Sequence, residues 1–292
     1  MQAELIEVSE KVYHDNGFTA TPCYSNSIGK LIIGKTPKHA WLAHPKLNPA
    51  YESDDASKFA LGSVAHAALL QGLDICEPLD FADWRTGASK EARDDAYLAG
   101  KIPMLQKQYE QVLAMVSAAK YQIEHCRDLG IQLSDGKGEQ TILWNEMGVV
   151  SKARLDWVKN DFSMIIDLKT TEIYNPAAWM RSIGSSGYDM QSLFYKRAVK
   201  ALTGIEPRFI FAVIETSAPY AMYFVELSQA WEAIANEKIK KALKLWETCL
   251  SSNKWPMYQQ SIMQADPPNF ELVDAEEIAV EMQDFNPEYL NA

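Results

Sequence analysis

The sequence lacks the long apolar runs that would place the protein in a membrane. No stretch approaches the roughly 20 consecutive apolar residues that a membrane-spanning helix needs. The N-terminus also lacks the basic and then apolar segments of a secretory signal peptide. We therefore expect a cytoplasmic protein with no membrane partner.

Cysteine is scarce, and its few copies lie far apart. The four cysteines, Cys23, Cys76, Cys126 and Cys249, include no C-x-x-C pair. This spacing argues against a zinc ribbon or an iron–sulfur cluster, since both need clustered thiolates. We expect buried, reduced thiols.

Positive charge is also in short supply. The chain has 28 Lys and Arg against 39 Asp and Glu, a net charge of −11. Taken alone, this balance disfavours a nucleic-acid partner, because Lys and Arg neutralise the phosphates. A local basic channel remains compatible with it. Much of the acid follows Gln264, in a stretch whose composition is typical of disordered segments.

What is present indicates an α/β protein. The 292 residues are 47% hydrophobic and 23% charged, as in ordinary globular domains. We expect one compact domain with a helical N-terminal portion (1–135), a core with a central mixed sheet flanked by helices (136–255), and an acidic tail (256–292). Hydrophobic periodicity predicts helices and strands along most of the chain. The expected helices begin near Ser25 and Thr36 and span 57–70, 102–128, 176–183, 188–203 and 228–251; the strands span 139–144, 149–159, 162–169, 207–214 and 221–227; 74–100 and 184–187 are expected to lack regular structure.

The most informative stretch is 153–171. Two alternating apolar runs flank Asn160-Asp161, a dipeptide suited to a two-residue hairpin turn. That turn would pair Asp156 with Ile165 and Arg154 with Asp167. Strand side chains alternate between faces, which divides the hairpin in two. The polar face would hold Arg154, Asp156, Asp167 and Lys169; the apolar face would hold Leu155, Trp157, Met164, Ile166 and Leu168.

Two acids followed by x-Lys on adjacent strands suit a metal-dependent phosphodiesterase. Diagonal neighbours would have Cβ atoms about 7–8 Å apart, so Asp156 and Asp167 could share a Mg²⁺, with the Leu168 carbonyl as a further ligand. Lys169 would orient or deprotonate the nucleophile, or stabilise the developing charge. The alternative is an acid-and-lysine patch on a solvated sheet face. The pattern alone leaves both open.

The roles of four other polar residues cannot be assigned from these patterns alone. His66, in Gly62-Ser63-Val64-Ala65-His66, is by itself more typical of a packed core histidine, although its small neighbours would admit a metal. Glu139 would lie beside Asp156 if the turn near 145–148 has an even number of residues, and away from it if three. Gln191 and Tyr195 lie one turn apart on one helix face.

In their order, these motifs resemble those of the PD-(D/E)xK nuclease superfamily, in particular its RecB-like group. Within that group the sequence is most similar to the exonuclease VIII (RecE) family of phage and prophage nucleases, over about residues 10–250. The matching motifs are Gly62-Ser63-Val64-Ala65-His66, Arg154-Leu155-Asp156-Trp157, Ile165-Ile166-Asp167-Leu168-Lys169-Thr170-Thr171 and Gln191-Ser192-Leu193-Phe194-Tyr195. Each motif alone is common; their combined order is specific.

The resemblance implies a restriction-endonuclease-like core and a role for each motif residue. His66, Asp156 and Asp167, with Leu168, would bind Mg²⁺, with Mn²⁺ as a substitute. Lys169 would be the catalytic lysine. Gln191 and Tyr195 would support the site or touch DNA, and Glu139 is an outer candidate.

The resemblance also implies an activity and partners. The protein would degrade the 5′-ended strand of linear double-stranded DNA, as a homo-oligomeric ring, for phage-type recombination in a bacterial host with a single-strand annealing recombinase. Arg154, Lys196, Arg197 and Lys200 are DNA-binding candidates. The alternatives are a single-strand or structure-specific nuclease or endonuclease of the same fold, and a non-catalytic DNA- or partner-binding module.

Overall fold

The computed structural model describes residues 2–52 and 61–267. The chain divides into two units, Met1–Met257 and Tyr258–Ala292. The described part of the second unit, 258–267, contains neither helix nor strand. Most of the predicted acidic tail and the first residues of the helix predicted at 57–70 lie outside the described residues. None of the described helices is both long and apolar enough to cross a membrane.

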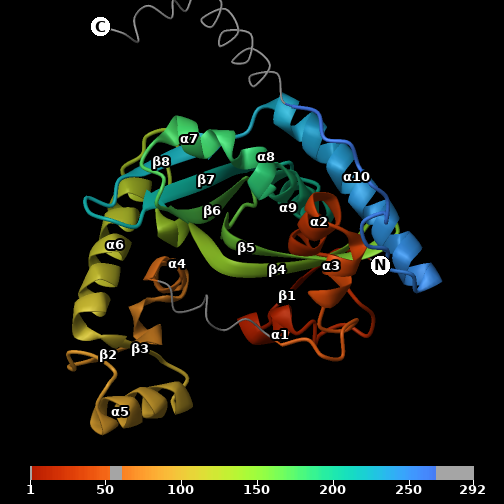
Figure 1. The fold of residues 1–292 in the computed structure, drawn as a ribbon. Coiled ribbons are helices and arrows are strands. Elements are labelled where there is room, and N and C mark those ends of the chain that lie inside the picture. The colour runs from red at the N-terminus through yellow and green to blue at the C-terminus, as the bar shows by residue number, and fades with distance from the viewer. Residues whose placement is uncertain (1, 53–60, 268–292) are drawn as a thin grey trace, which may run out of the picture. The chain divides into compact units, whose positions relative to one another are not determined.

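A mixed sheet of six strands forms the centre of the first unit (Figure 1). Its neighbours are antiparallel except for one parallel pair, β6 and β7. A parallel pair needs a crossover connection, which α7 (Pro176–Arg181), α8 (Ile183–Ser186) and α9 (Tyr188–Thr203) provide. In spatial order the strands are β1 (Glu4–Ile6), β4 (Gly136–Glu146), β5 (Val149–Lys159), β6 (Met164–Thr171), β7 (Arg208–Glu215) and β8 (Met222–Glu226).

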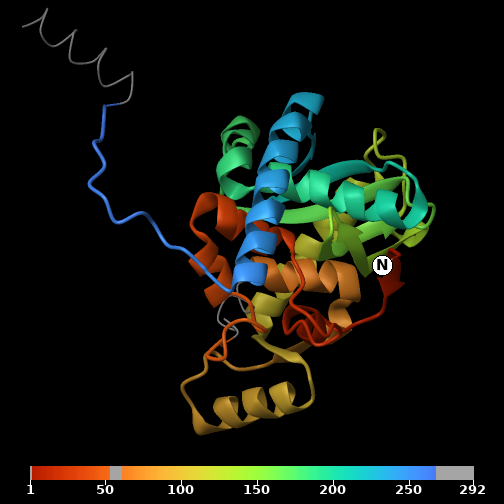
Figure 2. The ribbon, with the colours of Figure 1, turned by 90° about the vertical axis from the view of Figure 1, so that its right-hand side faces the viewer.

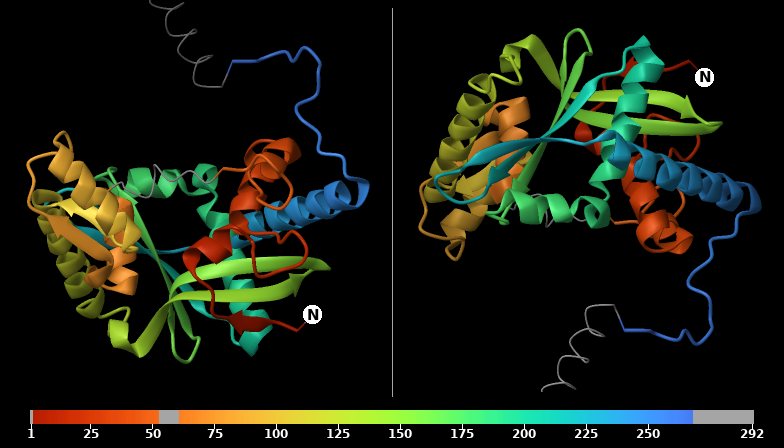
Figure 3. Two further views of the ribbon diagram at one scale, coloured as in Figure 1. Left: turned by 90° about the horizontal axis from the view of Figure 1, so that it is seen from below. Right: turned by 90° about the horizontal axis from the view of Figure 1, so that it is seen from above.

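Helices cover both faces of this sheet, as the views from below and above show (Figure 3). One face carries α2 (Asn26–Gly34), α3 (Pro37–Leu42), α9 and α10 (Gln229–Ser252); the other carries α4 (Leu61–Gln71) and α6 (Gln106–Glu124). Each face has its own hydrophobic cluster. Because strand side chains alternate, Ile165 packs into the first cluster and Ile166 into the second.

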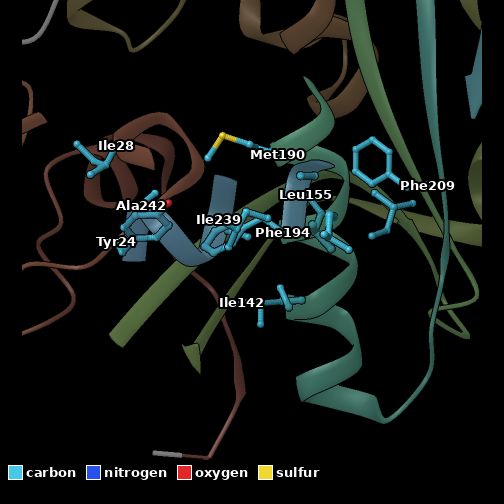
Figure 4. Packing of buried hydrophobic residues seen from close by; sticks show 14 of the residues in the cluster. Tyr24, Ile28, Ile142, Leu155, Met190, Phe194, Phe209, Ile239 and Ala242 are labelled. Carbon is cyan, nitrogen blue, oxygen red and sulfur yellow. The ribbon is translucent and has the colours of Figure 1, made fainter. Parts of the chain in front are cut away.

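The first cluster ties α2, α9 and α10 together (Figure 4). The Tyr24 ring meets the Phe194 ring of α9 edge-on at 5.4 Å and the Trp246 ring of α10 at 6.1 Å. Buried aromatic pairs of this kind add about 0.5–1.5 kcal/mol each beyond the area that they bury. This packing holds α9 against the sheet, with Gln191 facing β6.

Three predicted irregular or helical regions differ from the structure. The stretch 74–100, predicted to be a loop, contains β2 (Cys76–Leu79) and α5 (Gly87–Leu98), and the long helix predicted at 102–128 begins with β3 (Ile102–Leu105). β2 and β3 pair in parallel and adjoin α5, the helix at the bottom of Figure 2. Each contains a proline and neither alternates, which hid them from periodicity. The predicted break at 184–187 is largely the short α8.

The N-terminal segment contains a strand and a helix that periodicity missed. β1 pairs with β4, and α1 (Glu10–His14) follows with Ser9 as its N-cap. Both are shorter than the windows in which periodicity is visible. Single 3₁₀ turns lie at Leu73–Ile75 and Leu133–Asp135.

The β4–β5 hairpin settles the place of Glu139. Its loop is the two residues Met147 and Gly148, whose φ angles of 51° and 90° suit the primed turns of tight hairpins. The pairs on either side, Gly138 with Trp157 and Gln140 with Leu155, put Glu139 opposite Asp156. The even-membered alternative is therefore the one realised.

The β5–β6 hairpin has a longer turn than predicted. Its pairs are Trp157 with Ile166 and Val158 with Ile165, so the predicted pairs Asp156–Ile165 and Arg154–Asp167 are wrong by two residues. The cause is the Asp161 carboxylate, which accepts hydrogen bonds from Ser163 N (2.9 Å) and Oγ (2.6 Å), while Phe162 adopts a φ of 59°. A shift of two keeps each residue on its face and brings Asp156 level with Asp167.

One residue of the predicted apolar face lies elsewhere. Trp157, Met164, Ile166 and Leu168 pack in the second cluster, but Leu155 packs in the first. Beyond the Trp157–Ile166 pair, β5 and β6 no longer pair, and Glu139 in the adjacent β4 has a φ of 59° that breaks the alternation. The strands separate where the acids lie.

Candidate active site

A cavity of about 520 Å³ opens where β5 and β6 separate. It brings together residues from seven elements, α1, α2, α4, β4, β5, β6 and α9. Among the predicted site residues, its wall includes His66, Glu139, Arg154, Asp156, Leu168, Lys169 and Tyr195. Asp167 and Gln191 lie behind this wall and bond to it. Lys196, Arg197 and Lys200 are not part of it.

Asp156 joins the separating strands through its side chain. Its Oδ2 accepts a hydrogen bond from the Leu168 backbone N–H at 2.8 Å and contacts His66 Nε2 at 2.9 Å. Burial raises the pKa of Asp156, but the charge and hydrogen bond of His66, the Lys169 charge and the Leu168 N–H together hold it below its usual value. Burial likewise lowers the pKa of His66, but Asp156 raises it above normal overall. The two form an ion pair at the cavity wall.

Gly62 lets His66 reach Asp156. A Cβ atom at Gly62 would lie 2.8 Å from Thr170 Oγ1 and 3.1 Å from Thr170 Cβ, closer than side chains tolerate. The missing side chain therefore allows α4 to pack directly on β6. His66 follows one helical turn later on the same face. The small residues around His66 thus have a packing reason as well as a place in the motif.

Asp167 is fully buried and bonded on both oxygens. Its Oδ2 accepts a hydrogen bond from Gln191 Nε2 at 2.7 Å, and its Oδ1 forms an ion pair with Lys169. Burial raises the pKa of Asp167 to about 6, with the Asp156 charge adding to the rise and Lys169 opposing it. A buried carboxylate of this kind is easily protonated unless a cation is close.

Lys169 is positioned as a cation. Burial lowers its pKa, but the charges of Asp167 and Asp156 raise it above the ordinary value overall. Its Nζ also lies 5.4 Å from the Tyr188 ring centroid and 5.8 Å from that of Phe211. A protonated Lys169 can stabilise negative charge but cannot accept a proton, which favours its predicted electrostatic role over its predicted role as a base.

Tyr195 and Gln191 lie on the face of α9 that meets the site. The half-buried Tyr195 ring lines the cavity and meets Phe209 edge-on at 6.2 Å. Burial raises the pKa of Tyr195 well above its usual value, so it stays a neutral hydroxyl. Gln191 orients Asp167 from behind. The structure places both as their helical spacing predicts.

Glu139 and Arg154 form an ion pair at the edge of the cavity. Arg154 Nη1 also donates to the Val8 backbone oxygen at 3.0 Å. Burial raises the pKa of Glu139, although Arg154 opposes the rise. Glu139 therefore faces the site as its register requires, with Arg154 as its partner.

The other three predicted DNA contacts are engaged within the chain. Lys196 pairs with Glu232 at 2.6 Å, Arg197 with Glu146 at 2.8 Å, and Lys200 with Glu206 at 2.5 Å. Ion pairs of this kind fix α9 against neighbouring elements. A contact of these residues with DNA stays a prediction.

Several cavity residues had no assigned role from their residue type alone. They are Glu10, Tyr13, His14, Ser27, Ser63, Thr170 and Tyr188. Tyr13-His14 and Ser25-Asn26-Ser27 precede the motifs, and their contribution depends on α1 and α2 folding over the sheet. No sequence pattern predicts a role for Tyr188, because it is the first residue of its helix and lies outside the motif that begins at Gln191.

The donor set fits a hard divalent cation. Asp156 and Asp167 supply carboxylate oxygens and Leu168 a backbone carbonyl, the ligands that Mg²⁺ and Mn²⁺ prefer. Within 2–52 and 61–267, no three His, Cys, Asp or Glu side chains are grouped to hold an ion. The carboxylates instead bond His66, Gln191 and Lys169. The two acids would hold the cation, and His66 as a third ligand stays a prediction.

Comparison with known proteins agrees with this geometry. The family model described as "PDDEXK-like domain of unknown function (DUF3799)" matches residues 33–264. The crystal structure of a protein described as "Putative exonuclease" from Eubacterium rectale superimposes with a TM-score of 0.59 at 14% identity, covering 91% of this chain and 98% of that one. No curated protein matches the sequence. The predicted mixed α/β fold with a PD-(D/E)xK core is confirmed.

Proposed function

The chain belongs to the family of PDDEXK-like domains that matches it, and from this we propose that it is a Mg²⁺-dependent deoxyribonuclease that digests linear double-stranded DNA from its ends. The supporting observation is that Asp156 and Lys169 line one cavity, with the buried Asp167 paired to Lys169 behind its wall, and that His66 and Gln191 bond the two acids. A nuclease fold makes phosphodiester hydrolysis the reaction that best fits this set.

Each residue of the site has a separate role in the proposed hydrolysis. Asp156 and Asp167 would hold the divalent cation, which when bound would supply positive charge to polarise the phosphodiester and lower the pKa of a water molecule. Lys169, kept protonated by the acids, stabilises the negative charge that develops on the phosphate. Gln191 orients Asp167, and His66 orients Asp156. Because the carboxylates lie on separating strands, their positions depend on the packing behind each strand.

We test this with linear duplex DNA labelled at either the 5′ or the 3′ end, and with covalently closed DNA, in Mg²⁺. We expect loss of the linear duplex, early release of the 5′ label and survival of the closed DNA. Asp156→Asn and Lys169→Gln should each abolish digestion, whereas Lys120→Ala on α6 should not. Removing metal with a chelator should stop digestion by the unaltered protein.

The controls separate a chemical effect from unfolding. Each variant should keep the far-ultraviolet circular dichroism of the unaltered protein. Digestion that survives in both variants would contradict the assignment, and digestion of closed DNA would indicate an endonuclease. Retained DNA binding without cleavage in Mg²⁺ or Mn²⁺ would favour a binding module.

We further propose, from the resemblance to the exonuclease VIII family, that the protein acts as a homo-oligomeric ring in phage-type recombination, with a single-strand annealing recombinase, in the bacterial cytoplasm. A ring would reconcile a net charge of −11 with DNA binding by turning basic residues inward. Native mass spectrometry tests the ring, and a monomer at working concentrations would argue against it.

A further inference from the structure

A second cavity, of about 270 Å³, lies between α2, the start of α9 and α10. Three lysines line it: Lys30 in the middle of α2, Lys35 directly after its last residue, and Lys238 on α10. Its remaining wall includes the apolar side chains Leu31, Ile33 and Met190. A cationic rim over an apolar wall suits a ligand with an anionic group on an uncharged body.

Only one of the three lysines has an ion-pair partner among the residues that the structure describes. Lys238 pairs at 2.6 Å with Asp189, whose side chain is fully buried. Lys30 and Lys35 form no ion pair within the part of the chain that the structure describes. Burial and the Lys169 charge lower the pKa of Lys30, while the charges of Asp167 and Asp189 partly oppose them. Two lysines without an ion pair, lining one cavity of a chain whose net charge is −11, are suited to bind an anionic group.

The second cavity borders the catalytic one. Tyr188 lines the catalytic cavity, and its ring centroid lies 5.8 Å from Lys30 Nζ and 5.4 Å from Lys169 Nζ. Gly187 leaves room for Lys30 beside this wall, since a Cβ atom at Gly187 would lie 2.7 Å from Lys30 Cγ. One aromatic ring therefore separates the catalytic lysine from the second cationic group.

We propose that this second cavity binds a phosphate group of the nucleic-acid strand that is cleaved, with Lys30 and Lys35 as its cationic partners. The attached sugar or base would lie on Leu31, Ile33 and Met190. The cavity falls just below the range of about 300–1,000 Å³ typical of ligand pockets, which suits one nucleotide and excludes a duplex. This inference rests on the proposed function, because it assigns the same strand to both cavities.

Binding without cleavage tests the inference separately from the activity. Labelled single-stranded and duplex oligonucleotides, each with and without a terminal phosphate, are titrated with protein in a chelator over a range of salt concentrations. We expect Lys35→Ala and Lys30→Gln each to weaken binding about three- to tenfold. The slope of log K against log salt should become shallower by about 0.7–0.9, as for one lost phosphate contact.

Lys120→Ala on α6 is the matched control, since it removes one exposed lysine from a helix on the opposite face of the sheet, and it should change neither quantity. A loss confined to oligonucleotides with a terminal phosphate assigns that group, and a loss on all of them assigns an internal phosphodiester. Unchanged affinity and slope in both variants, or no binding by the unaltered protein, overturns the inference. Binding without digestion in Mg²⁺ would instead refute the proposed activity alone.

Discussion

Adding one methyl group at Gly62 tests whether the contact of α4 with β6 holds the site together. The new Cβ would lie 2.8 Å from Thr170 Oγ1, 3.1 Å from its Cβ and 3.3 Å from its Cγ2. Overpacking of this kind costs about 1–3 kcal/mol, and alanine returns about 1 kcal/mol of helix propensity. We expect Gly62→Ala to lower the free energy of unfolding by up to about 2 kcal/mol.

The clash can be relieved from the other side. Thr170→Ala removes two of the three crowded atoms, so the double variant should be more stable than the two separate effects predict, by about 1 kcal/mol or more. Urea unfolding at constant m measures this coupling. Gly87→Ala is the matched control, because a Cβ at Gly87 meets nothing within 4 Å and should not destabilise.

The same variant links packing to the site. If α4 moves away from β6, the 2.9 Å contact of His66 with Asp156 is lost, and digestion by Gly62→Ala should fall at least about tenfold, with partial recovery in the double variant. Coupling within about 0.3 kcal/mol of zero, with unchanged stability, would refute this reasoning.

Two further predictions concern ionisable side chains away from the proposed metal ligands. His44 is 2% exposed, contacts the Cys23 carbonyl through Nε2 and accepts from Lys46 N, and burial lowers its pKa to about 4. As the pH falls from about 6.5 towards 4, His44 is therefore protonated in the unfolded chain before it is protonated in the folded one. At pH 5, urea unfolding should show a free energy of unfolding that is lower by about 2 kcal/mol because of this residue. His44→Gln should make the decrease of stability with falling pH less steep, and an unchanged pH profile would contradict the prediction. Lys238→Met leaves Asp189 buried without its partner and should lower the free energy of unfolding by about 3–5 kcal/mol. The double variant with Asp189→Leu should recover most of this loss. An equal loss in the single and double variants would show that the unpaired Asp189 is not its cause.

Long periodic elements could be predicted closely from the sequence. β5 at 149–159 and α9 at 188–203 have the predicted bounds, because each alternates or repeats over enough residues to identify its period. The acids and Lys169 could be identified for the same reason, since two apolar strands framed them. These features rest on local order along the chain.

What could not be predicted depends on single side chains and distant contacts. The turn at 160–163 is set by Asp161 bonding Ser163, which a dipeptide rule does not include. Leu155 packs in the first cluster because β5 and β6 separate, and this separation cannot be predicted from the sequence of either strand alone. His66 needed α4 to meet Asp156, and that meeting depends on a glycine and a threonine more than a hundred residues apart.

The two hydrophobic clusters have a consequence for how the chain tolerates insertions. Ile165 and Ile166 are neighbours in β6, yet they pack into different clusters on opposite faces. Sliding β6 by one residue would expel both from their clusters at once and turn Asp167 away from Gln191. The turn before β6 can therefore change length without moving the acid, because the two cores, and not the turn, hold β6 in place. Insertions or deletions in that loop should therefore leave the Asp167 carboxylate where it is.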